Sequence, residues 1–335
     1  MDGLRTMEAQ NSRIAIRLLP SMADFAFLMP ILFLFGRMDG MKNLLGDGDT
    51  GWHIRTGEWI AANHVVPMRD MFSYSKPEGV WYAWEWASDL LFAWLNMKGG
   101  LAAVALAAIL IISITFLLLF RLVRRQSNAI VAILVTMCAA ASSSIHWLAR
   151  PHLFTLLFLV LFYGALERVR QGQTKYLWFL PLGAILWTNL HGGFVAGIAM
   201  VGAYGLAELL QMALASDAET RRQARPQAVR YFVCALACLA ASLVNPYTYH
   251  LHVHVFQYLR DPYAAEHIIE FSSINFHHPM AIFFETLLLL GAAATFRSFR
   301  RRTYVEGLLI LVTGHGALLS ARNIPLFTIV AARLY

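Results

Sequence analysis

The chain has 335 residues, of which 58% are hydrophobic and only 14% are charged. About a quarter of the residues of a soluble domain are charged, so this composition excludes an ordinary soluble protein. The content of 22 Phe, 12 Tyr and 9 Trp also excludes intrinsic disorder. The cysteines Cys138, Cys234 and Cys238 all lie inside apolar runs, which excludes a disulfide scaffold. The net charge is +7, but the basic residues stand in clusters between apolar runs, so we expect no nucleic-acid partner.

Apolar runs long enough to cross a bilayer recur along the chain, since a spanning helix needs about 20 residues. The complete or nearly complete runs lie at 21–37, 101–120, 129–147, 152–166, 176–190, 193–213, 231–245, 281–296 and 304–320. A tenth run begins near Ile324, and the sequence stops at Tyr335, so the chain looks truncated at its C-terminus or finishes on a half-span. We therefore predict an all-α, polytopic transmembrane bundle of nine to ten spans that forms one module over 1–335.

The orientation of this bundle follows from the basic residues. Of the 27 Lys and Arg residues, 17 fall before the first predicted span or directly after the second, fourth, sixth and eighth. The positive-inside rule places these segments in the cytoplasm, together with the N-terminal tail 1–20. The opposite side then carries a long first external loop, 38–98, and a second external loop, 245–279. The first span is interpreted as an uncleaved anchor.

The first external loop is predicted to contain helices that lie in the membrane interface. In GWHIRTGEWIAANH, Trp52, Ile54, Trp59, Ile60 and Val65 give one apolar face. This pattern is typical of an interfacial helix. The stretch ASDLLFAWLNM, 87–97, shows the same pattern and leads into the second span.

Polar residues concentrate on the predicted external side, and their densest cluster lies at 46–60. Asp47 and Asp49 stand two residues apart in a Gly-rich stretch near His53. Such a pair can hold a divalent cation or supply a general base, and the alternative is a solvated turn. Asp70, Trp84 and Glu85 follow, and acidic groups set among aromatic rings suit a sugar-binding site.

Three tight turns on the external side carry further candidates. Arg150 and Arg322 each stand shortly before a proline, between two spans. Arginine binds phosphate in a bidentate manner, so both residues are candidates for a lipid phosphate or pyrophosphate. The alternative is a snorkelling side chain or an ion pair with the first-loop acids. His191 lies in NLHGGF and faces the same side, either as a site residue or as a structural histidine.

The second external loop combines histidines with acidic residues. His250, His252 and His254 have a spacing that zinc sites can use, but nothing firmly completes a ligand set, so a substrate-covering loop is preferred. Glu266 and Glu270 are one helical turn apart and are candidates for contacting substrate or a cation.

The ordered motifs resemble those of a known family. They are D-x-D-x-x-W-H, G-x-W-I, P-x-x-D-x-F-S-Y, W-x-x-x-E-W, A-R-P, N-L-H-G-G-F, L-x-N-P-Y and A-R-N-x-P-L-F. From about Asp47 to Leu326 the chain resembles bacterial integral-membrane glycosyltransferases of the GT-C superfamily. Many relatives have a second aromatic residue where this chain has Gly51, and many continue past the A-R-N-x-P turn.

The resemblance implies an enzyme that uses a sugar linked to polyprenyl phosphate. Transfer of a hexose or pentose would invert the anomeric centre at the outer face of the bacterial cytoplasmic membrane. A first-loop acid would act as the base or as a ligand of Mg or Mn. By motif, the catalytic candidates are Asp47 and Asp49, and a metal would be held by Asp47, Asp49 and Glu270. The substrate-binding candidates are His53, Asp70, Trp84, Glu85, Arg150, His191, Asn245, Tyr247 and Arg322.

Two other functions remain open at this stage. A non-catalytic accessory subunit could keep the fold inside a larger membrane complex, with protein subunits as partners besides membrane lipid. A transporter of lipid-linked sugars would need polar residues through the midplane, and the predicted spans are mostly apolar there.

Overall fold

The computed structural model describes residues 20–75 and 79–333, and within these ranges the chain is helical and contains no β-strand. The predicted tail 1–20 falls outside them except for Pro20. The N-terminal half contains α2 (Met22–Arg37), α3 (Met41–Leu44), α4 (Asp49–Asn63), α5 (Trp86–Val123), α6 (Ala129–Ser143), η1 (Ser144–His146), α7 (His152–Arg170), η2 (Thr174–Trp178) and α8 (Phe179–Leu190). It is followed by α9 (Phe194–Leu214), α10 (Ala218–Ala241), α11 (Tyr249–Leu259), α12 (Pro262–His267), η3 (Ile269–Phe271), α13 (Ala281–Arg300), α14 (Tyr304–Leu319), η4 (Ala321–Asn323) and α15 (Ile324–Ala332).

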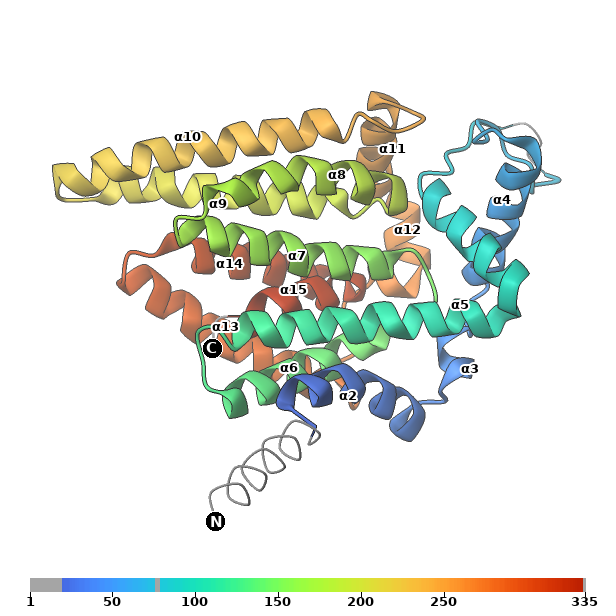
Figure 1. Ribbon diagram of the computed structural model, residues 1–335, viewed down its shortest axis with the longest axis horizontal. Helices are drawn as coiled ribbons and strands as arrows, with labels where there is room; N and C mark the ends of the chain where they lie inside the picture. Colours follow the sequence, from blue (N-terminus) through green and yellow to red (C-terminus); the bar gives the residue numbers. More distant parts are fainter. Residues whose placement is uncertain (1–19, 76–78, 334–335) are drawn as a thin grey trace, which may run out of the picture.

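The long helices lie side by side in one bundle, and the short helices gather at one end of it (Figure 1). That end holds α3, α4, α11, α12 and the first part of α5. Buried apolar side chains from α2 through α15 form one continuous core. The short helices therefore pack against one end of the bundle, where the turns between several long helices also lie.

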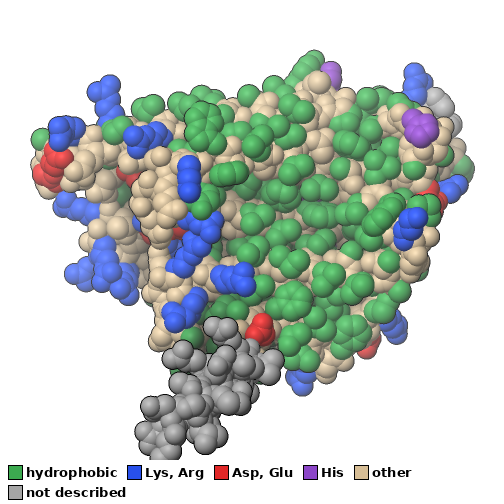
Figure 2. All heavy atoms as spheres, in the orientation of Figure 1, with side chains coloured by type: hydrophobic (Ala, Val, Ile, Leu, Met, Phe, Trp, Pro, Cys, Tyr) green, Lys and Arg blue, Asp and Glu red, His purple; other side chains and the backbone are tan. Residues whose placement is uncertain are grey.

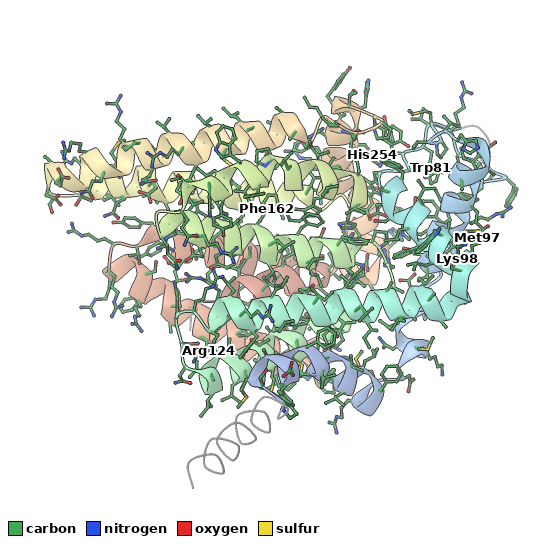
Figure 3. The ribbon with its side chains drawn as sticks, in the orientation of Figure 1. Trp81, Met97, Lys98, Arg124, Phe162 and His254 are labelled. Atoms are coloured by element: carbon green, nitrogen blue, oxygen red, sulfur yellow. The ribbon has the colours of Figure 1, made fainter. Side chains whose placement is uncertain are left out.

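Helix α5 joins the two predicted segments 87–97 and 101–120 in one element. Its path breaks at Gly99 and Gly100, where Gly100 has a φ of 64° that side chains with a Cβ rarely adopt. Lys98 stands at this break, and Arg124 follows the last turn at the opposite end of the bundle (Figure 3). The part before the break packs against α4 instead of continuing the span.

Among the residues that the structure describes, five helical segments are long and apolar enough to cross a membrane. They are Trp86–Val123, Ala129–His146, His152–Arg170, Phe194–Leu214 and Ala281–Arg300. The other predicted spans also fold as helices, but α2 and α14 have 16 residues, α8 has 12 and α15 has nine. Helix α10 has 24 residues, and its first 13 residues carry Glu219 and four arginines. By length and apolarity, these five described helices could cross a membrane, which is consistent with a membrane protein.

The surface agrees with a membrane setting. Apolar side chains cover the middle of the face drawn in Figure 2, whereas Lys and Arg gather at the end where α9 meets α10 and α13 meets α14. Leu236 on α10 and Leu289 on α13 are 65% and 73% exposed. Apolar surface of this extent is typical of contact with lipid or with another protein.

Candidate functional site

A cavity of about 1030 Å³ opens at the end of the bundle that carries the short helices. Its walls come from the start of α4, the segment before α5, the turns before α7 and α9, and the elements α11, η3 and η4. Segments far apart in the sequence thus meet there. Of the predicted site residues, Asp49, His53, Trp84, Glu85, Arg150, His191 and Arg322 line this cavity.

Arg150 is surrounded by three carboxylates. Its Nη2 lies 2.8 Å from Asp49 Oδ2, and its Nη1 lies 3.0 Å from Asp47 Oδ2 and 3.5 Å from Glu270 Oε2. The turn that carries Arg150 is fixed against α3, since Ala149 N donates to Leu44 O. Burial alone would lower the pKa of Arg150, but the charges of Glu270, Asp49 and Asp47 outweigh it and raise that pKa. Arg150 is therefore a permanent cation in the cavity wall.

Arg322 approaches the same place from η4. Its Nη1 lies 3.2 Å from the Tyr258 hydroxyl and 3.6 Å from Glu270 Oε1, and its guanidinium carbon is 4.4 Å from the centroid of the Phe271 ring. Ser320 Oγ donates to Glu270 O, which ties η4 to η3. One carboxylate, that of Glu270, thus bridges the two arginines.

A second group of charges lies deeper, where α4 packs on α5. His53 Nδ1 is 2.7 Å from Asp89 Oδ1, and both side chains are buried. Gly57 makes this close packing possible, because a Cβ at that position would lie 2.0 Å from the Asp89 carbonyl oxygen. Desolvation would lower the pKa of His53, but the hydrogen bond to Asp89 and the charges of Glu85 and Asp89 raise it above its ordinary value.

Glu85 stands between two histidines. Its Oε1 is 3.2 Å from His191 Nε2, and its Oε2 is 3.5 Å from His53 Nε2. Burial disfavours the charged carboxylate and raises the pKa of Glu85 to about 7, with the nearby His53 acting in the opposite direction. Glu85 can therefore exchange a proton near neutral pH.

The protonation of His191 follows from its donors. The Gly193 N–H donates to His191 Nδ1 at 3.0 Å, and the Thr155 hydroxyl lies 2.7 Å from the same nitrogen. Thr155 accepts a hydrogen bond from Trp187 Nε1, which leaves its own hydrogen for His191. His191 is thus neutral, with Nε2–H donating to Glu85. Burial and the charge of Arg322 hold the pKa of His191 well below its usual range.

Aromatic rings complete two walls of the cavity. Trp84 packs edge-on against His254 and Tyr258, with ring centroids 4.9 and 5.1 Å apart. Trp52 packs against Phe72 and Trp81. His254 and Trp81 lie at the same end of the bundle in Figure 3. These rings offer flat apolar surface next to the charged groups.

Three predicted substrate-binding residues instead shape loops away from the cavity lining. Asp70 Oδ1 accepts from the backbone N–H groups of Phe72 and Ser73. Asn245 Nδ2 donates to Ser242 O and Thr248 O. The buried Tyr247 hydroxyl donates to Pro67 O and accepts from Ala83 N, both at 2.7 Å. Tyr247 therefore joins the two predicted external loops.

The residue set predicted for a metal does not fit one in this arrangement. Asp47, Asp49 and Glu270 all direct a carboxylate oxygen at Arg150. In the parts of the chain that the structure describes, no group of three or more His, Cys, Asp or Glu side chains is placed to hold a metal ion. The histidines of α11 also diverge, since His252 Nε2 lies 2.8 Å from Ser242 Oγ while His254 stacks on Tyr82.

Sequence reasoning missed several groups that the structure brings to this site. The predicted interfacial helix at 87–97 contains Asp89, and a carboxylate among apolar residues at the start of a span is a signal for a functional group. His146 and Thr155 line the cavity, as does Tyr258. The hydroxyl of Thr155 and the ring of Tyr258 gave no sequence signal, because their roles depend on contacts with distant segments.

No protein-family model matches the chain, and no curated protein matches it.

Proposed function

We propose that this chain is a membrane glycosyltransferase of the GT-C type, which moves a sugar from a polyprenyl-phosphate donor to an acceptor hydroxyl. The observation that carries the proposal is the meeting of Arg150 and Arg322 on Glu270 within one cavity. The same cavity contains exposed aromatic surface and buried acid–base groups. This combination matches the three needs of the reaction, which are a phosphate site, a sugar site and a proton acceptor.

The two arginines would hold the phosphate of the donor. Their guanidinium groups present forked donors that suit phosphate oxygens, and Glu270 shows that one anion can bridge them. When the bond between the anomeric carbon and the phosphate oxygen breaks, charge builds on that oxygen. Fixed cations at this point stabilise the transition state.

The aromatic rings would hold the sugar. Trp52 and Trp84 both line the cavity, and an indole face can pack against the apolar face of a sugar ring. The cavity volume of about 1030 Å³ lies at the upper end of the range for small-molecule sites. It therefore has room for a sugar, a phosphate and the first carbons of a lipid.

In chemical terms, the acceptor oxygen attacks the anomeric carbon from the face opposite the phosphate, which inverts that centre. The electron pair of the broken bond leaves with the polyprenyl phosphate. The proton of the acceptor hydroxyl passes to a basic group of the protein. The motif resemblance assigns this role to Asp47 or Asp49.

The proposal includes a topology. We place the N-terminus in the cytoplasm and the cavity at the outer face of a bacterial inner membrane, with nine to ten helices crossing. The segregation of Lys and Arg to the opposite end of the bundle supports this orientation (Figure 2).

The test measures the rate at which proteoliposomes transfer a radiolabelled sugar from a polyprenyl-phosphate-linked donor to glycerol, which serves as a simple acceptor alcohol. Arg322→Gln removes one proposed phosphate contact. Arg150→Lys keeps the positive charge beside three carboxylates but removes the forked guanidinium donors that bind phosphate in a bidentate manner. We expect each to lower the transfer rate about 100-fold to 1000-fold. Arg55→Gln, an exposed arginine on α4, is the control and should leave the rate unchanged. Undiminished transfer by both cavity variants would overturn the proposal.

A further inference from the structure

In the structure, both aspartates predicted as the base lie against Arg150. Asp49 Oδ2 lies 2.8 Å from Arg150 Nη2. One carboxylate oxygen of Asp47 contacts Arg150, and the other accepts a hydrogen bond from the Asp49 backbone N–H at 2.8 Å. A proton arriving on either carboxylate would weaken its ion pair with Arg150 just when that arginine must hold the phosphate. Both aspartates are therefore better suited to orienting Arg150 than to accepting a proton.

His53 lines the cavity, and its Nε2 lies 3.5 Å from Glu85 Oε2. Its Nδ1 lies 2.7 Å from the buried Asp89 carboxylate, which fixes the proton on Nδ1 and leaves the Nε2 lone pair on the cavity side. A carboxylate that holds an imidazole in this tautomer also stabilises the imidazolium that forms. The close approach of α4 and α5 at Gly57 holds the side chains of His53 and Asp89 within hydrogen-bond distance.

Glu85 is placed to stabilise the proton once it arrives. Neutral His191 donates Nε2–H to Glu85 Oε1, which leaves Oε2 facing His53 Nε2 at 3.5 Å. A protonated His53 would thus lie between Asp89 on one side and Glu85 on the other. The pKa of His53 is raised by the same two carboxylates, in the direction that favours proton uptake.

We propose that His53 Nε2 takes the proton of the acceptor hydroxyl and that Asp89 is its positioning residue, an inference that rests on the proposed transfer reaction. In the balanced step, the acceptor O–H bond breaks as its oxygen bonds to the anomeric carbon. The hydrogen moves to Nε2 without its electrons, and the bond to the phosphate oxygen breaks with its pair on that oxygen. The imidazolium later releases the proton to water through the open cavity.

The first experiment separates transfer from donor binding. His53→Gln should lower the transfer rate about 100-fold to 10,000-fold, and Asp89→Asn should fall at the lower end of that range. Retention of radiolabelled polyprenyl phosphate by the same proteoliposomes should stay within about twofold of the wild type. His250→Gln replaces an exposed histidine and should leave the rate unchanged. Asp49→Asn should affect donor binding more than the rate of a bound complex.

A second readout would not respond to a merely structural role. The groups facing His53 are Asp89 on α5, Glu85 before α5, His191 after α8 and Arg150 before α7. The transfer rate should rise with pH as His53 loses its proton, and Asp89→Asn should move this rise to lower pH. In a protein with ¹⁵N-labelled histidine, the strongly deshielded Nδ1 proton of His53 should disappear in Asp89→Asn and persist in Asp49→Asn.

The outcomes separate the two proposals. Normal transfer by His53→Gln together with a large loss in Asp49→Asn would overturn the assignment of the base and leave the transferase proposal in place. A wild-type protein that transfers no sugar from the polyprenyl-phosphate donors would overturn the function itself, and with it this inference.

Discussion

Helix α7 has a cluster of charged side chains at each end, and the two clusters differ in the balance of positive and negative charge. At its first turn lies the cavity network of Asp47, Asp49, Glu85, Asp89 and Glu270 with Arg150 and Arg322. The second cluster, which we call the inner cluster, lies near the last turn of α7. There Arg170 pairs with Glu167 and with Glu306 of α14, and Glu167 also pairs with Arg333, which follows α15. One cluster lines an open cavity, and the other is packed between helices.

The inner cluster is matched in charge. Tyr204 donates to Glu167 Oε1 at 2.6 Å, Arg170 lies 3.1 Å from the same oxygen, and Arg333 contacts the other oxygen. Arg170 also reaches Glu306 at 2.6 Å. Two carboxylates thus meet two guanidinium groups, which is the arrangement expected of a structural connection between α7, α9, α14 and α15.

The cavity network is unmatched, since it contains five carboxylates and two guanidinium groups. The remaining balance depends on histidines and on the protonation of Glu85, whose pKa is raised to about 7. Charged groups that are not fully neutralised next to a cavity are costly to fold and are characteristic of functional sites. We therefore expect substitutions in the inner cluster to lower the stability of the fold, whereas substitutions in the cavity network should alter donor binding and proton transfer.

The largest expected effect on stability is at the inner cluster. Glu167→Ala should lower the free energy of unfolding in detergent by about 3–5 kcal/mol, because it leaves Arg170 and Arg333 without their shared partner. Glu219→Ala breaks an exposed pair with Arg222 on α10 and should cost less than about 1 kcal/mol. Sugar transfer per folded molecule should be normal in both variants. Equal stability of the two would contradict the structural role of the inner cluster.

The helices were largely predictable from the sequence, because long apolar runs have few alternatives to a helix in a membrane. The run at 101–120 lies inside α5, and the run at 193–213 lies inside α9 except for Gly193, which directly precedes that helix. The run at 176–190 shows what could not be read, since its first residues form the short η2 and leave only 12 residues in α8. Where a helix ends depends on caps and neighbours as well as on hydrophobicity.

The site was predictable as a set of polar residues on one predicted side of the bundle, but not as a network of pairs. The motifs indicated Arg150 and Arg322, and the structure places both on Glu270. They gave no means of knowing that Asp89 would meet His53, because that contact depends on the close packing of α4 against α5 at Gly57. The sequence likewise could not separate Tyr247, which joins two loops, from residues that face the cavity.

The next effect concerns the pH dependence of stability. The folded state raises the pKa of Glu85 from 4.5 to about 7, so it retains a proton that the unfolded chain releases. The contribution of Glu85 to the free energy of unfolding is present in full below pH 4.5 and is lost as the pH rises to about 7. This loss amounts to about 3 kcal/mol at most. Unfolding of the wild type and of Glu85→Gln in detergent should therefore diverge over this window. Parallel pH curves would contradict the burial of an ionisable Glu85, and Glu58→Gln on exposed α4 surface is the control.

A smaller effect should distinguish loop structure from substrate binding. Tyr247→Phe leaves Pro67 O and Ala83 N without the hydroxyl, which should cost about 1–3 kcal/mol of stability. Affinity for labelled polyprenyl phosphate should stay unchanged, because Tyr247 does not line the cavity. The control is Tyr249→Phe, which removes the hydroxyl of an exposed ring. A loss of lipid affinity without a loss of stability would return Tyr247 to the binding site.

The smallest expected effect tests the unmatched charge directly. Glu270 lies between Arg150 and Arg322, where the phosphate of the donor is proposed to bind, so its carboxylate competes with the lipid. Glu270→Gln should therefore strengthen binding of polyprenyl phosphate by about 1 kcal/mol, or roughly fivefold. Equilibrium binding to the detergent-solubilised protein measures this change. Glu266→Gln removes the same charge from an exposed position on the same loop and controls for long-range attraction. Weaker binding by Glu270→Gln alone would mean that Glu270 holds the arginines in place for the phosphate, and the excess of carboxylates would then serve to orient the site.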